Sequence, residues 1–408
     1  MRAGWIRLWR CVAWGGIGLS LYAGWLTVDD VRDRSASERA IAEACDGLVS
    51  AAAVMDLHGG TVRAETSEYD RIDARRPRSS CTVYQASGSG RTTGLFSLAV
   101  RAGGKTEPLN WIGDHTEPFA LPGPAERSRR TDITAVADRR PEPRPVGDGS
   151  LGWYGNWYTT VRAECGPGSS TTAPPLLHIT AGADYDDVSG ADRARLARLA
   201  RSAAETLTHR IGCRTRLPAL PAGQPAPVPT VLRSARSAGG SCRWFARHHE
   251  RLGGGPLPDR ALAAPVGDAA PLESCLLAVS PRQVRRTAGG LPEDKRDLAD
   301  SALTHSPWWL RTVTYTGAEA RAVGYEEFDG RDVVIKPGTA GHTGDAWWAS
   351  SVCGGKPAVH TLGTGYAYDD VLGSGTVSAL FRAYVDDIAE RRGCTHVTYP
   401  DAADFRHL

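Results

Sequence analysis

The tetrapeptide Tyr-Asp-Asp-Val occurs twice in the sequence, at 185–188 and at 368–371. It is the clearest candidate for a chemical role. Each copy has two carboxylates beside a tyrosine, and a histidine lies one strand length upstream; the residues are His178, Tyr185, Asp186 and Asp187 in one copy and His360, Tyr368, Asp369 and Asp370 in the other. Such a group could bind a divalent cation or act as acid and base. Each tetrapeptide also directly precedes a predicted helix, where carboxylates cap free amides and complement the helix dipole. Capping is the interpretation we favour, and a binding or catalytic site is the alternative.

Other chemical motifs are weak or absent. The chain has no Gly-x-Ser-x-Gly elbow, no His-Glu-x-x-His frame and no Cys-x-x-Cys pair, which disfavours serine hydrolases, zinc peptidases and thiol redox proteins. We therefore assign no catalytic residue, no metal ligand and no cofactor. A set of clustered tryptophans could form a carbohydrate-stacking surface, although packing in a core is the commoner role; they are Trp153, Trp157, Trp308, Trp309, Trp347 and Trp348.

The cysteines indicate both a compartment and a duplication. Eight of the nine follow the N-terminal segment, and an even number fits an oxidising environment where disulfides persist. They form two sets of four with similar spacings. A duplicated unit should close its own bridges in the same way each time, which predicts the pairs Cys45 with Cys81, Cys165 with Cys213, Cys242 with Cys275, and Cys353 with Cys394.

The residues around the cysteines strengthen the repeat. Aromatic and β-branched runs precede Cys165 and Cys353, as strands prefer, and an apolar stretch with a histidine follows each. The segments 189–210 and 374–392 then carry apolar residues at helical spacing. Each copy is thus predicted to contain two strands and a helix. The sequences upstream of these parts match poorly, so we assign only the C-terminal half of each unit to the repeat.

These elements predict an α+β protein in which an N-terminal transmembrane helix precedes two related extracytoplasmic domains. Each domain is expected to be a mainly antiparallel sheet with packed helices. The expected segments are a cytoplasmic end at 1–10, an anchor at 11–28, a first domain at 35–215, a proline-rich linker at 216–240 and a second domain at 241–408. The Pro- and Arg-rich stretch 121–150 is expected to be a long surface loop.

The N-terminal segment has the pattern of a membrane anchor. Three arginines, Arg2, Arg7 and Arg10, precede an uncharged run over 11–28, which would span about 27 Å as a helix. The positive-inside rule places residues 1–10 in the cytoplasm and the bulk outside the cell membrane. A cleaved signal peptide is the alternative, but Leu21 occupies the −3 position before Ala23, where signal peptidase prefers a small residue.

Charge and composition limit the partners. The 48 basic and 46 acidic residues give a net charge of +2, so the chain lacks the overall positive field of nucleic-acid-binding proteins. With its anchor, its excess of arginine over lysine, a Cys-Asp-Gly-Leu-Val segment at Cys45 and Cys-Thr-Val-Tyr at Cys81, the chain resembles the uncharacterised, membrane-anchored, cystine-stapled envelope proteins of actinomycetes. The resemblance implies an envelope location and transfers no catalytic residue.

The function we expect is that of a single-pass envelope protein that acts by binding, as an accessory or sensing subunit, with an unidentified protein or cell-wall partner. The alternative is an extracytoplasmic enzyme acting on cell-wall glycans, with Asp186, Asp187, Asp369 or Asp370 as its acids. The ligand and the oligomeric state do not follow from the sequence.

The anchor should remain uncleaved because the run at 11–28 lacks a good cleavage site. Mass spectrometry of the membrane-extracted protein is expected to give the mass of the intact chain. A mature chain that begins near residue 24 would contradict this.

Overall fold

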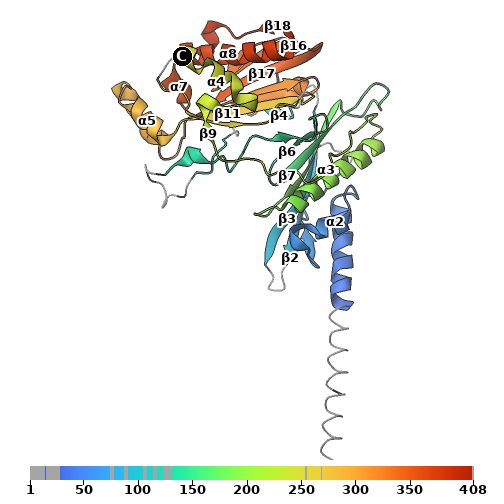
Figure 1. The fold of residues 1–408 in the computed structure, drawn as a ribbon. Coiled ribbons are helices and arrows are strands. Elements are labelled where there is room, and N and C mark those ends of the chain that lie inside the picture. Colours follow the sequence, from blue (N-terminus) through green and yellow to red (C-terminus); the bar gives the residue numbers. More distant parts are fainter. Residues whose placement is uncertain are drawn as a thin grey trace, which may run out of the picture.

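The computed structural model describes Trp14 and residues 28–406, except for 74–77, 87–90, 104–107, 114–116, 122, 124–127, 129–130, 253–254 and 268. The predicted cytoplasmic end and anchor lie outside these residues, apart from Trp14 and Val28. Within the described part, no helix combines the length and the apolar character that crossing a membrane requires. The rest is an α+β structure of antiparallel sheets and packed helices, as predicted (Figure 1).

Two large sheets account for most strands. The first has the order β1-β2-β3-β8-β7-β6-β5, and its strands are β1 (Ala64–Thr66), β2 (Arg78–Ala86), β3 (Thr92–Gly103), β5 (Arg144–Pro145), β6 (Gly152–Tyr154), β7 (Tyr158–Glu164) and β8 (Leu176–Ala183). The second has the order β15-β16-β17-β12-β11-β10-β9, with β18 beside β16, and its strands are β9 (Arg233–Ser234), β10 (Arg260–Ala263), β11 (Leu272–Ala278), β12 (Trp309–Thr316), β15 (Gly341–Thr343), β16 (Ala346–Cys353), β17 (Lys356–Thr364) and β18 (Cys394–Thr398).

A small third sheet connects the halves of the chain. It contains β4 (Asn110–Trp111), β13 (Val323–Glu326) and β14 (Asp332–Val334). Strand β4 precedes the β7–β8 hairpin in sequence, yet it pairs in parallel with β13, which follows β12 of the second sheet. The two halves of the chain are therefore linked by backbone hydrogen bonds.

The helices lie between or after the strands. A helix covers 28–44, and the others are α2 (Ala51–Met55), α3 (Gly190–Arg210), α4 (Arg243–Leu252), α5 (Pro281–Ala288), α6 (Arg296–Ala302), α7 (Tyr368–Leu372) and α8 (Ser374–Arg392). Short 3-10 segments are η1 (Leu57–Gly59), η2 (Ile133–Ala135), η3 (Ala235–Ser237), η4 (Gly240–Cys242), η5 (Glu293–Lys295), η6 (Glu319–Ala322) and η7 (Ala402–Phe405).

The two large sheets repeat the same strand order. The first contains β1-β2-β3-β8-β7-β6 and the second contains β10-β11-β12-β17-β16-β15, with every neighbouring pair antiparallel. In both, a long helix, α3 or α8, follows the hairpin of the last two central strands. The duplicated arrangement thus includes the N-terminal strands of each unit, where the sequences no longer match.

Four disulfides close equivalent positions in the two copies. They join Cys45 to Cys81, Cys165 to Cys213, Cys242 to Cys275 and Cys353 to Cys394, which are the pairs that the duplication predicts. In each copy one bridge connects an entry segment to a central strand. The other connects the end of a strand to the residues after the long helix.

Helices cover one face of each large sheet. Leu196, Leu199 and Leu207 of α3 are buried against the first sheet, and Leu380, Phe381 and other apolar residues of α8 are buried against the second. Helix α8 ends where Gly393 adopts a φ of 59°, a left-handed conformation that glycine adopts at little cost. Each sheet therefore has its own apolar core beneath its long helix.

The other face of the second sheet is covered by a segment from the first half of the chain. Phe119, Ile133 and Ala137 pack in one cluster with Leu276 of β11 and Trp309 of β12. Thr134 donates a hydrogen bond from Oγ1 to the carbonyl oxygen of Val279 at 2.9 Å. The stretch 121–150 was predicted to be a surface loop, and this was wrong for 133–142 because its scattered apolar and acidic side chains pack against a partner far away in the sequence.

The predicted proline-rich linker at 216–240 runs beside this covering segment. Leu232 donates from its backbone N–H to the oxygen of Ala135 at 3.0 Å, and Ala137 donates to the oxygen of Thr230 at 2.8 Å. The linker therefore supplies backbone hydrogen-bond partners to the covering segment.

One buried carboxylate joins the two large sheets. Glu319, in η6 after β12, has no exposed surface. It accepts hydrogen bonds from Nδ2 of Asn110 at 2.8 Å, from Nε of Arg162 at 3.0 Å, and from Nε2 of His178 at 3.0 Å. Its three partners come from β4, β7 and β8. The position of η6 is thus fixed against the first sheet.

The surroundings of Glu319 stabilise its charged form. Burial alone would raise the pKa, but the charge and hydrogen bond of His178, with the contributions of Arg162 and Asn110, lower it to about 2. Removing one partner of a buried ion pair costs about 3 to 5 kcal/mol, because the remaining charge is left without compensation. We therefore expect Glu319 to be essential for the arrangement of the two sheets.

The free energy of unfolding should depend on pH through the protonation of Glu319. Because the folded pKa lies below the ordinary value of 4.5, the unfolded chain binds the extra proton first, and the stabilisation is lost as the pH falls from about 4.5 towards 2. Urea unfolding of Glu319→Gln is expected to show a lower free energy of unfolding at pH 7 and a flatter pH dependence than the wild type. The control is Glu326→Gln on the exposed part of β13. Equal pH slopes for Glu319→Gln and wild type would contradict the assignment.

Candidate functional site

The first acidic tetrapeptide does not cap its helix. The N-cap of α3 is Ser189, whose Oγ accepts a hydrogen bond from the N–H of Asp192 at 3.1 Å and donates one to Oδ2 of Asp192 at 2.8 Å. Asp186 and Asp187 lie in the bend that precedes this cap. The capping prediction is wrong here because a serine nearer the helix provides the oxygen.

The second tetrapeptide has a different local structure. Tyr368, Asp369 and Asp370 belong to the short helix α7, whose N-cap, Ala367, provides no side-chain hydrogen bond. Tyr368 is buried, stacks on Trp308 with ring centroids 5.5 Å apart, and donates from its hydroxyl to the oxygen of Pro256 at 2.5 Å. The two aspartates lie in the first turn, where negative charge suits the helix dipole, but they are not caps. Identical residues therefore serve different roles in the two copies.

His178 and His360 lie on opposite faces of their sheets. His178 contacts Glu319, on the face away from α3, while His360 contacts Tyr384 of α8 across 6.3 Å between ring centroids. His178 lies seven positions before Tyr185, whereas His360 lies eight before Tyr368. A shift of one residue moves a strand side chain to the other face. The position that corresponds to His178 is therefore Thr361, and the two histidines are not equivalent.

His360 belongs to a buried polar network. Its Nε2 is 2.8 Å from Oγ of Ser351 and its Nδ1 is 2.9 Å from Oγ1 of Thr314, which in turn is 2.6 Å from the hydroxyl of Tyr384. Burial, together with the charge of Arg392, lowers the pKa of His360 to about 3, so the ring is neutral. The Ser351–His360 pair has the composition of a nucleophile and its base, but both residues are buried.

The first pair of aspartates lines an open cavity of about 570 Å³, together with Asp138, Asp184 and Arg193. Arg193 donates to the carbonyl oxygens of Val188 at 2.7 Å and Pro225 at 3.2 Å, so it holds the loop and the linker together. Asp369 and Asp370 belong to a helix of the other half. Across the part of the chain that the structure describes, no group of three or more histidine, cysteine or acidic side chains is arranged to hold a metal ion.

The clustered tryptophans belong mainly to the cores. Trp308, Trp309, Trp347 and Trp348 are at most 9% exposed, and Trp347 stacks on Phe405. Trp153 is partly buried and meets the ring of His178 edge-on, with centroids 5.0 Å apart. They do not form one exposed stacking surface. Trp157 and Trp309 instead contribute to the walls of two adjoining cavities.

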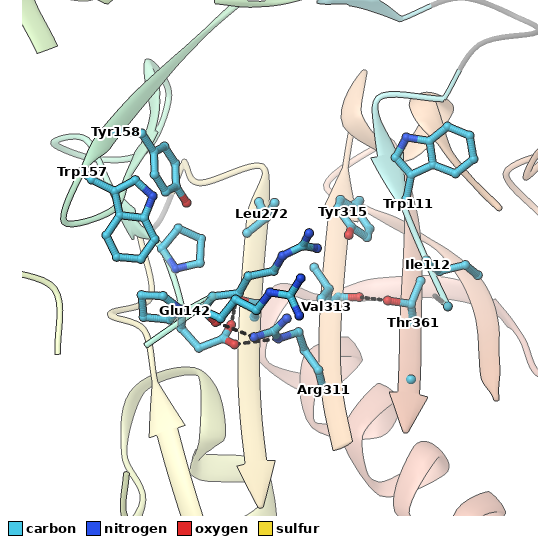
Figure 2. A pocket seen from close by; sticks show the side chains of 17 residues that line it. Trp111, Ile112, Glu142, Trp157, Tyr158, Leu272, Arg311, Val313, Tyr315 and Thr361 are labelled. Atoms are coloured by element: carbon cyan, nitrogen blue, oxygen red, sulfur yellow. Dashed lines mark hydrogen bonds and ion pairs between the residues drawn. The ribbon is translucent and has the colours of Figure 1, made fainter. Parts of the chain in front are cut away.

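A cavity of about 410 Å³ lies between the two halves of the chain (Figure 2). One wall comes from β4 and from the segment before and at the start of β7, with Trp111, Ile112, Trp157 and Tyr158. The other comes from the helix-free face of the second sheet, with Leu272, Val313, Tyr315 and Thr361. The lining also contains four charged residues, namely Arg139, Arg140, Glu142 and Arg311. Concave, mostly apolar sites with a few polar groups between structural units are typical of small-molecule binding.

Glu142 and Arg311 form a buried ion pair at the base of this cavity. Nε of Arg311 donates to Oε1 of Glu142 at 2.7 Å, and the hydroxyl of Ser274 donates to the other carboxylate oxygen. Nη2 of Arg311 also donates to the backbone oxygen of Arg140 at 2.7 Å. The carboxylate of Glu142 is thus already engaged, and Arg311 fixes the backbone that carries the neighbouring arginines.

Arg139 and Arg140 give the cavity an excess of positive charge. Within the described residues, neither side chain makes an ion pair with a carboxylate. The pKa of Arg140 is lowered by burial and then by the charges of Arg311 and Arg139. Three guanidinium groups and one carboxylate line the cavity, and Glu117 nearby offsets part of the positive charge around Arg140. An anion placed among the guanidinium groups would relieve their remaining repulsion.

Two tyrosines add uncharged hydrogen-bond donors. Burial, followed by the charge of Glu142, raises the pKa of Tyr158 to about 12, and burial raises the pKa of Tyr315 above its ordinary value. Both phenols remain protonated at neutral pH and are able to donate to an oxyanion. The cavity can therefore bind an anion with charged and neutral donors while its aromatic and aliphatic walls contact an apolar part.

These residues were not identified from the sequence. Arg139, Arg140 and Glu142 lie in the stretch that was expected to be a surface loop. One signal was present: Arg311 interrupts an otherwise uncharged strand, and a charge in a buried strand requires a partner. Its partner comes from 169 positions upstream, which no local pattern indicates.

Comparisons with family models, with curated proteins and with solved structures yield no match to this chain.

The observed cap of α3 predicts which residue stabilises that helix. Ser189→Ala should lower the free energy of unfolding by about 0.5 to 2 kcal/mol, the usual cost of a lost N-cap. Asp186→Asn combined with Asp187→Asn should have little effect, because neither residue caps the helix. Chemical denaturation of both variants tests this, and a larger loss for the aspartate variant than for Ser189→Ala would contradict the assignment.

Proposed function

We propose that this chain is a single-pass envelope protein whose extracytoplasmic, disulfide-stapled region binds small organic anions in the cavity between its two sheets. The observation that carries the binding role is the pair of arginines, Arg139 and Arg140, that face this cavity without a carboxylate partner among the described residues. The role is that of an accessory or sensing subunit.

The extracytoplasmic location is supported by one feature of the sequence and one of the structure. The arginines before an uncharged N-terminal run follow the positive-inside rule. The four disulfides are compatible with an oxidising compartment. The membrane anchor and the envelope location remain part of the proposal.

Arg140 is the residue that best explains anion recognition. Its backbone is held by Arg311 and by the carbonyl oxygen of Pro118, which accepts from its N–H at 3.3 Å. A fixed backbone limits the conformations of the side chain and lowers the entropy lost on binding. A guanidinium presents paired N–H donors to a carboxylate or another oxyanion. Arg140 is exposed to solvent, and the positive charges of Arg139 and Arg311 beside it favour binding of an anion.

A sensing role follows from the origin of the walls. Arg139, Arg140 and Tyr158 come from the first half of the chain, and Arg311 and Tyr315 come from the second. An anion bound among the three arginines would contact both halves and reduce the repulsion between them. Binding would then favour the relative arrangement of the sheets that has the higher affinity for the anion. The size of this shift is set by the difference in affinity between the two arrangements.

Isothermal titration calorimetry of the full-length chain in detergent, with benzoate as the probe, tests this proposal. Benzoate should bind to the wild type, and Arg140→Gln should weaken the binding by about 10- to 100-fold, the loss expected for a hydrogen bond to a charged group. Arg198→Gln, on the exposed side of α3, makes the same change in net charge and should bind as the wild type does. Added sodium chloride should weaken binding by screening.

Absence of benzoate binding by the wild type, or equal weakening in Arg140→Gln and Arg198→Gln, would contradict the proposed function.

A further inference from the structure

A second cavity adjoins the one between the sheets. It has a volume of about 330 Å³, and its wall shares Gly113 and Arg139 with the first cavity. Gly113 has a φ of 85°, and a Cβ placed there would meet no described atom within 4 Å apart from its chain neighbours. The two cavities therefore meet at a wall that carries no side chain at Gly113.

The backbone around Arg139 fixes the two cavities relative to each other. The carbonyl oxygen of Pro118 accepts hydrogen bonds from the N–H groups of Arg139 at 3.2 Å and Arg140 at 3.3 Å. The N–H of Ala120 donates to Oδ1 of Asp138 at 2.8 Å. The segment around Pro118 and Ala120, which lines the second cavity, is thus hydrogen-bonded directly to residues 138–140.

The second cavity differs from the first in its chemistry. Its base contains Phe119 and Trp309, which are buried in one apolar cluster. Two large side chains at its wall are exposed, Leu121 at 45% and Tyr366 at 73%. Exposed apolar surface beside a cavity is typical of a surface that a ligand covers.

Charge limits what enters this second cavity. Its wall has two carboxylates, Glu117 and Asp345, and the shared Arg139. The first cavity has three guanidinium groups and one carboxylate, so an anionic group is favoured in the first cavity over the second. The charge of a bound ligand should therefore be confined to one end.

We infer that the bound molecule is an elongated organic anion, with an oxyanion head among Arg139, Arg140 and Arg311 and an uncharged apolar or aromatic tail on Phe119, Trp309 and Tyr366. This inference rests on the proposed function, because it assigns the head to the same arginines. It adds the length and polarity of the ligand, which the first cavity alone does not determine.

Paired probes test the inference by calorimetry on the full-length chain. Benzoate has the head without a spacer, 4-phenylbutyrate places a ring beyond three methylene groups, and 4-phenylbutanol has the same tail without the charge. Burial of each methylene gives about a fourfold gain in affinity, so 4-phenylbutyrate should bind at least about tenfold more tightly than benzoate. The neutral alcohol should bind much more weakly than the acid.

Two variants separate the head from the tail. Arg140→Gln should weaken the binding of both acids, whereas Tyr366→Ala should reduce the ratio of the two affinities. Tyr69→Ala is the matched control, because Tyr69 is 96% exposed and lines neither cavity, and it should leave both affinities as in the wild type.

Equal affinities for the two acids, with benzoate still dependent on Arg140, would overturn the elongated ligand and leave the proposed function standing. An unchanged affinity ratio in Tyr366→Ala would overturn the placement of the tail. Failure of both acids to bind would overturn the proposed function and this inference together.

Discussion

The arrangement of this molecule depends on one buried carboxylate. Glu319 lies after a central strand of the second sheet and binds Asn110, Arg162 and His178, all from the first half of the chain. A buried charge is tolerated only where its hydrogen-bonding capacity is filled and an opposite charge is near. All of its partners come from the other half of the chain. If the two sheets separated, the carboxylate would therefore lose its hydrogen bonds and its opposite charges.

The cavity between the sheets follows from this constraint. The same helix-free face of the second sheet that carries η6 also presents Arg311. Arg311 binds Glu142 and the backbone of Arg140, so a second ion pair holds the covering segment from the first half. The two ion pairs differ in one respect. Around Glu319 the charges are nearly balanced, whereas around Glu142 two further arginines have no carboxylate partner in the described structure. The ion pair of Glu319 thus holds the two halves of the chain together. The ion pair of Glu142 leaves two nearby guanidinium groups available to a ligand.

The sequence predicts local features of this fold more accurately than distant contacts. The α+β class, the long helices over 190–210 and 374–392, and the cystine pairs follow from periodicity and duplication. Duplication also misled the assignment of His178 and His360, because the offset of one residue before the tetrapeptide places them on opposite faces. Capping by the aspartates failed for a similar reason, since Ser189 lies closer to the helix.

The residues of the proposed anion site could not be identified in this way. The segment around Arg139, Arg140 and Glu142 has no regular period, and its partners lie on strands more than 130 residues away. These charged side chains line a cavity only because the second sheet packs against this segment. The strand charge Arg311 was a usable signal, because it indicates a buried partner without saying which one.

The most direct measurement is a crystal structure of the full-length chain grown with 4-(4-bromophenyl)butyrate, with anomalous data collected at the bromine edge. The account predicts one strong bromine peak beside Trp309 and Tyr366 and carboxylate density within hydrogen-bonding distance of Arg140. A bromine peak elsewhere on the molecule, or no ordered ligand at concentrations that saturate binding in solution, would contradict it.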